Sequence, residues 1–104
     1  MANNAELKFV SLGPELAKAQ ASFRATGKAV SLEHFFFVPS GQITDLLRRL
    51  RAEGFTARED ESSPGVIAKR AEIVELEQVR RLTREMCDLA DKFAADYDGW
   101  KIEN

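Results

Sequence analysis

The stretch Leu32-Glu33-His34-Phe35-Phe36-Phe37-Val38, followed by Pro39-Ser40-Gly41, decides the fold that this sequence predicts. Aromatic and β-branched residues favour β-strands, and a Pro-Ser-Gly run is typical of the turn that ends one. We therefore predict a strand over residues 32–38, and the elements on either side of it follow from hydrophobic spacing and turn signals.

A helix is predicted directly after this strand. Ser40 is a candidate for its N-cap, because a serine hydroxyl can accept a bond from the first free backbone N–H groups. The following apolar residues recur at the spacing of one helical face, and they are Ile43, Leu46, Leu47 and Leu50. Gly54 is expected to end the helix in a left-handed conformation.

A hairpin, a long helix and a last strand complete the pattern after residue 54. Segments 55–59 and 66–72 flank a polar, turn-forming stretch, which predicts two strands joined by a loop. An apolar stripe predicts the longest helix over residues 75–95. The segment 97–102 predicts a terminal strand, with a bulge at Gly99.

One further helix is predicted near the N-terminus. Pro14 lies where a first helical turn tolerates proline, and Gly27 provides a stop. Its apolar stripe is thin, since only Leu16 and Phe23 are large, so this helix needs a surface to pack on. We treat residues 1–27 as an N-terminal segment and helix.

The order of elements over residues 28–104 is β-α-β-β-α-β. Two right-handed β-α-β crossovers joined by a hairpin give an antiparallel sheet with both helices on one face. The prediction is an α+β fold, a ferredoxin-like sandwich with an extra N-terminal helix. A chain of 104 residues has room for one such domain.

The predicted sheet leaves its other face open. Alternation along the first strand places Phe35 and Phe37 on one side, together with Glu33, and His34 on the opposite side. Both sides are apolar, so two large rings lie on the open face unless something covers them. Either the N-terminal helix or a protein partner does so, and the thin stripe of the helix favours the helix.

Residues that could catalyse a reaction or bind a metal are few. The chain has one histidine, His34, and one cysteine, Cys87, and both fall in predicted regular elements. A structural role for each is favoured over a Cys–His catalytic pair, and structural zinc needs about four ligands of these types. No P-loop, dinucleotide fingerprint or GxSxG motif is present. We predict no enzymatic activity, no cofactor and no metal.

Two carboxylates near the C-terminus are candidates for an acid–base pair. Asp96 and Asp98 flank Tyr97, so they point to the same side of a strand, where carboxylates can tune one another. No third catalytic group converges there. The favoured interpretation is structural, with Asp96 ending the long helix and Asp98 preparing the bulge.

Charge argues against a nucleic-acid partner. The chain has 15 Lys and Arg against 17 Asp and Glu, whereas proteins that bind duplexes usually have a basic excess. Two arginine clusters, at 48, 49 and 51 and at 80, 81 and 84, are explained by solvated helix faces. RNA-recognition motifs share the topology, but segment 66–71 lacks the second row of aromatic residues that they use. We predict a protein partner and no direct nucleic acid.

The N-terminal residues and the apolar runs predict a cytoplasmic protein without membrane contact. The first ten residues have no basic segment followed by an apolar run, as a secretory signal would. The longest unbroken apolar run is Phe35-Phe36-Phe37-Val38, far short of the ~20 residues that span a bilayer.

Several short stretches together resemble one protein family. They are Glu33-His34, Leu50-Arg51-Ala52-Glu53-Gly54-Phe55, and Ala90-Asp91-Lys92-Phe93 followed by Tyr97-Asp98-Gly99-Trp100. Over about residues 32–102 the chain resembles the regulator of ribonuclease activity B family, the ribonuclease E inhibitor proteins. The Tyr-Asp-Gly-Trp group is the most specific part of the likeness.

The resemblance implies a bacterial cytoplasmic regulator that binds ribonuclease E outside its catalytic centre and restrains RNA decay, with no catalytic residues of its own. The family motif maps onto Glu33, His34, Gly54, Tyr97, Asp98, Gly99 and Trp100. With the two rings of the open face added, the candidate binding residues, as contacts or as their support, are Glu33, His34, Phe35, Phe37, Tyr97, Asp98 and Trp100.

One departure from the family limits how far its partner can be transferred. The best-known members are strongly acidic and carry an acidic extension, whereas this sequence stops at Asn104 with a net charge of −2. We expect weaker attraction to a basic partner. The alternative is an interaction module for an unrelated protein, self-associating through the open sheet face, so both a monomer and a homodimer stay open.

Overall fold

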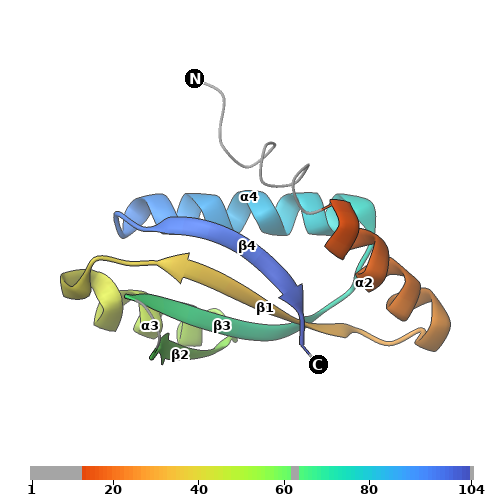
Figure 1. The fold of residues 1–104 in the computed structure, drawn as a ribbon, viewed down its shortest axis with the longest axis horizontal. Coiled ribbons are helices and arrows are strands. Elements are labelled where there is room, and N and C mark those ends of the chain that lie inside the picture. Colours follow the sequence, from red (N-terminus) through yellow and green to blue (C-terminus); the bar gives the residue numbers. More distant parts are fainter. Residues whose placement is uncertain (1–12, 62–63, 104) are drawn as a thin grey trace, which may run out of the picture.

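The computed structural model describes residues 13–61 and 64–103 of the chain. Its elements, in chain order, are α2 (Gly13–Thr26), β1 (Val30–Phe37), the 3-10 turn η1 (Ser40–Gln42), α3 (Ile43–Ala52), β2 (Thr56–Asp60), β3 (Gly65–Glu72), α4 (Leu76–Lys92) and β4 (Asp96–Ile102). The four strands form one sheet in the order β2-β3-β1-β4 (Figure 1).

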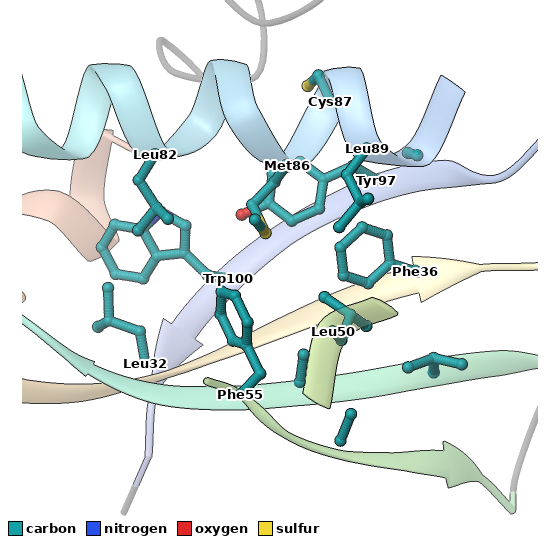
Figure 2. Packing of buried hydrophobic residues seen from close by; sticks show 14 of the residues in the cluster. Leu32, Phe36, Leu50, Phe55, Leu82, Met86, Cys87, Leu89, Tyr97 and Trp100 are labelled. Atoms are coloured by element: carbon teal, nitrogen blue, oxygen red, sulfur yellow. The ribbon is translucent and has the colours of Figure 1, made fainter. Parts of the chain in front are cut away.

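The topology confirms the predicted α+β, ferredoxin-like arrangement. All three strand pairs are antiparallel, and each helix, α3 or α4, connects two strands that have a third strand between them. Buried residues of both helices and the inward side chains of the strands form a single core cluster (Figure 2). Both helices therefore pack on one face, and within residues 13–61 and 64–103 neither of them covers the other face of the sheet, the open face.

Strand β1 shows the predicted alternation. His34 and Phe36 are buried on the helix side, whereas Phe35 is half-buried and Phe37 is 49% exposed on the other side. The strand begins two residues earlier than predicted, because Val30 pairs with Glu72 at the end of β3. An apolar strand in the centre of the sheet thus carries aromatic rings on both faces.

The ends of the two core helices differ from the predictions in two places. The predicted N-cap at Ser40 is wrong, because Ser40 begins the 3-10 turn and α3 starts at Ile43, with Gln42 as its N-cap. The long helix ends at Lys92 and not at residue 95, since the chain turns through Ala94 at φ 54° so that β4 can begin at Asp96.

The predicted stop at Gly54 is confirmed. Gly54 has a φ of 91°, a left-handed conformation that favours glycine, and Phe55 N–H donates to the Leu50 carbonyl at 3.0 Å. This hydrogen bond folds the chain back against the last turn of α3. Phe55 is thereby buried and reaches the core ahead of β2.

Helix α2 does not cover the open face. Its buried residues, Leu16 and Ala19, belong to the core cluster beneath α3 and α4, and the helix contacts β4 and β1 (Figure 1). Phe37 stays half exposed. The prediction that this helix shelters the ring of Phe37 is therefore wrong, while the domain division at residues 27 and 28 stays a prediction.

A bulge interrupts the pairing of β4 with β1, as predicted near Gly99. Phe35 pairs with Gly99 and Phe36 pairs with Tyr97, which leaves Asp98 as the extra residue. Gly99 has a φ of 109°. The bulge allows Tyr97 and Trp100 to face the core together, although they are an odd number of residues apart.

We expect Gly99→Ala to lower the free energy of unfolding by about 1–2 kcal/mol, because an L side chain is strained at this φ. Urea denaturation of the variant measures the effect. Gly41→Ala is the matched control, since Gly41 lies on the surface with open space around its Cα and without a positive φ. Equal losses in the two variants would contradict a special role for the bulge.

Candidate functional site

The structure divides the seven predicted binding residues by burial. Three are in the core, with exposed fractions of 0% for His34, 4% for Tyr97 and 3% for Trp100. The other four reach the surface: Glu33, Phe35 and Phe37 on the open face and Asp98 in the bulge. The surface group can contact a partner, while the buried group can only support the surface.

The buried group is built around one hydrogen bond. His34 Nδ1 and the hydroxyl oxygen of Tyr97 are 2.8 Å apart, and this hydrogen bond joins the neighbouring strands β1 and β4. The Phe55 ring meets the His34 ring edge-on, with 5.7 Å between centroids. Trp100 pairs with His34 across the strands and, like Tyr97, lies on the α4 side of the sheet (Figure 2).

Burial keeps both partners of this hydrogen bond neutral. It lowers the pKa of His34 from 6.5 to about 3, helped by the positive charge of Arg70. Burial also raises the pKa of Tyr97 well above 10, helped by the nearby Cys87 and Glu72. A neutral, enclosed imidazole without solvent access is suited to hold the strands together.

In the described part of the chain, the histidine and the cysteine are both buried, and no group of side chains could hold a metal ion. Cys87 and His34 are both buried, on α4 and β1. Within residues 13–61 and 64–103, no three His, Cys, Asp or Glu side chains gather into a group that could hold a metal ion. No helix in that part is long and apolar enough to cross a membrane.

The open face carries an apolar centre with a charged border. Phe35 pairs with Ile67 of β3, and Lys101 Nζ lies 5.5 Å from the centre of the Phe35 ring. Beside them is a hollow of about 200 Å³, lined by Glu33, Thr56, Arg58, Ile67, Lys69 and Glu103. Lys69 and Glu103, both in its lining, form an ion pair of 2.7 Å.

Sequence reasoning found the rings of this face but missed their neighbours. Ile67, Lys69 and Arg58 come from strands whose register was not fixed by the sequence. The available signal was alternation in β3, which places Ile67 and Lys69 on the same side. Pairing with β1 is what brings that side next to Phe35.

A second hollow lies on the helix side, between α3 and α4. Its volume is about 320 Å³, and its lining is Arg49, Glu53, Phe55, Arg70, Glu85, Met86, Asp88, Leu89 and Lys92. Arg70 is fixed there, with its guanidinium carbon 4.0 Å from the centre of the Phe55 ring and a hydrogen bond donated to the Glu53 carbonyl. The lining has three cations and three carboxylates, so its net charge favours neither sign.

A family model described as Regulator of ribonuclease activity B (RraB) matches residues 17–102. The chain belongs to the RraB family. The match includes most of α2 and all four strands, and it contains each of the seven predicted binding residues. A search of curated proteins gave no match. The family regulates ribonuclease activity and is not a family of catalysts.

The group Tyr97-Asp98-Gly99-Trp100, the most specific part of the sequence resemblance, has a structural explanation. Tyr97 supplies the hydroxyl for His34, Asp98 and Gly99 form the bulge, and Trp100 fills the core beside Leu82 (Figure 2). The most specific part of the resemblance thus builds the sheet of this RraB-family chain. Of these four residues, only Asp98 is exposed.

We expect the free energy of unfolding to fall by roughly 2–3 kcal/mol between pH 7 and pH 4.5 because of His34. The folded pKa of about 3 lies below the ordinary 6.5, so the unfolded chain binds the proton and stability is lost as the pH falls. Urea denaturation across this range measures it, and His34→Leu should remove this part of the slope. An unchanged slope in that variant would assign the loss to other groups.

We expect Tyr97→Phe to cost about 1–3 kcal/mol, because it leaves the buried His34 Nδ1 without its partner. A double-mutant cycle with His34→Leu separates this pair from the general loss of packing. The two changes should be clearly less than additive. Additive costs would mean that the two side chains do not stabilise one another.

Proposed function

We propose that this RraB-family chain regulates ribonuclease E by binding it as a protein partner outside its catalytic centre, without catalysing a reaction itself. The open face of the sheet is the observation that carries the proposal. Phe37 is 49% exposed there, the half-buried Phe35 continues the apolar surface along β1, and Ile67, which is 9% exposed, pairs with Phe35 from β3. In a family that regulates ribonucleases, an exposed aromatic surface fits a binding role.

Binding is supported over catalysis by where the reactive side chains lie. The one histidine and the one cysteine of the chain are buried on opposite layers of the core, His34 in the sheet and Cys87 in α4. A substrate would have to reach an imidazole whose exposed fraction is 0%. The groups on the open face are instead rings, ammonium and guanidinium groups and carboxylates, which suit recognition.

A protein partner is supported over RNA by the composition of the open face. Strand β3 places Ile67 and Lys69 there, so a second row of aromatic residues for stacking bases is lacking in this strand. The charge of Lys69 is paired with Glu103, and Glu33 lies in the same cross-strand row. We also infer that the chain works in the bacterial cytoplasm, as its likeness to ribonuclease E inhibitors implies.

We expect Phe37→Asp to weaken binding to purified ribonuclease E about tenfold or more, because the exposed ring is lost and a charge is introduced. Binding is measured by titration, and the cleavage rate of a defined RNA is followed in parallel. Leu76→Asp is the matched control. Leu76 is 47% exposed and comes shortly after Glu72, the end of β3 far from Phe37. That end is about 23 Å along the sheet from Gly65, which pairs with Phe37.

Three outcomes would count against the proposal. If the wild-type chain neither binds ribonuclease E nor changes its cleavage rate, ribonuclease E is not its partner. If Phe37→Asp and Leu76→Asp weaken binding to ribonuclease E equally, the open face is not the contact surface. Sedimentation that shows a wild-type homodimer and a Phe37→Asp monomer would support the alternative, in which a second copy occupies this face.

A further inference from the structure

We propose that the Phe37 end of the open face binds an arginine side chain of the protein partner, with the guanidinium over the ring and paired with Asp96 and Asp98. The inference rests on the proposed function, since it names the chemistry that the partner presents to this face. The three residues Phe37, Asp96 and Asp98 are called the ring-and-carboxylate site below.

Pairing between β1 and β4 brings the members of this site together. Phe37 and Asp96 are direct cross-strand partners, so their side chains lie on the same face with Cβ atoms about 5 Å apart. Asp98 is the extra residue of the bulge and is exposed two positions further along β4. Neither aspartate forms an ion pair with another residue of the described ranges 13–61 and 64–103.

The neighbouring ring on the same face shows what the Phe37 ring lacks. Phe35 has Gly99 opposite it, and the Lys101 ammonium lies 5.5 Å from the centre of its ring. Phe37 has a carboxylate opposite it, and within the described residues no cation lies over its ring. Because the face of an aromatic ring attracts cations, Phe37 is the ring left for a cation supplied from outside.

Arginine fits this position better than lysine. A planar guanidinium can stack on a ring while its N–H fork reaches two carboxylate oxygens, and it is more weakly hydrated than an ammonium. The same chain shows the difference elsewhere. Arg70 lies 4.0 Å from the centre of the Phe55 ring, closer than Lys101 lies to that of Phe35.

The hollow between α3 and α4 is the competing location for a cationic side chain. It carries exposed carboxylates at Glu85 and Asp88 on α4, but Lys92 stands beside them and Arg70 already occupies the Phe55 ring. These cations repel an incoming arginine. The ring-and-carboxylate site has two carboxylates and an unoccupied ring, so charge favours it.

A peptide of six arginines tests the proposal on the isotope-labelled full chain by NMR titration. We expect shifts at the amides of Phe37, Asp96 and Asp98, and binding weakened about fivefold by Asp96→Asn with Asp98→Asn and by Phe37→Leu. The control double variant, Glu85→Gln with Asp88→Asn, removes two negative charges from the opposite face and should change binding less than about twofold. A peptide of six lysines should bind more weakly.

Each contrary result overturns the inference. Equal weakening by the two double variants would show general charge attraction, and shifts centred on α3 and α4 would move the site to the helix side. The folding control is the thermal unfolding temperature of each variant. If it is unchanged, misfolding is excluded as the cause of weaker peptide binding. Because the probe is a peptide, ribonuclease E can still bind if this site fails, and the site can stand if ribonuclease E does not bind.

Discussion

The extra residue at Asp98 lets Tyr97 and Trp100, three positions apart, both face the core from strand β4. In a regular strand these two side chains would point to opposite faces, because alternation has a period of two. A regular strand would therefore leave a tryptophan on the open face or a tyrosine outside the core. The bulge at Gly99 removes that conflict, and the packing between the sheet and α4 depends on it.

The same bulge determines which polar group reaches His34. The imidazole has an exposed fraction of 0%, and a buried polar atom without a partner is costly. With the shifted register, Trp100 pairs with His34 and the Tyr97 hydroxyl comes within 2.8 Å of its Nδ1. A backbone irregularity in an edge strand thus gives Nδ1 of the buried histidine in the central strand β1 its polar partner.

The elements of the fold could be predicted because their signals are local. The aromatic strand, the apolar stripe of α4 and the glycines at 54 and 99 each follow from neighbouring residues. The start of α3 could not be predicted in this way, because a 3-10 turn at Ser40 precedes the helix. The end of α4 could not be predicted either, because it depends on the pairing of Asp96 with Phe37.

The position of α2 and the surroundings of Phe35 depended on contacts between distant segments. Leu16 and Ala19 could pack on either side of the sheet by composition, and the core at the β4 edge accommodated them. The partners of Phe35, such as Ile67, depend on the register between β1 and β3. Alternation within one strand gives the face of a residue, but pairing between strands gives its neighbours.

Burial also limits what membership in the RraB family says about the partner. The Tyr-Asp-Gly-Trp group that carries the resemblance has its two rings inside the core, and Gly99 has no side chain to offer. A chain can keep this group because it needs the bulge, whatever its partner is. Phe37, Phe35 and Asp96 lie outside the core cluster, so their chemistry can change without disturbing the core. If the open face binds the partner as proposed, the choice of partner depends on these exposed side chains, separately from the buried Tyr97 and Trp100.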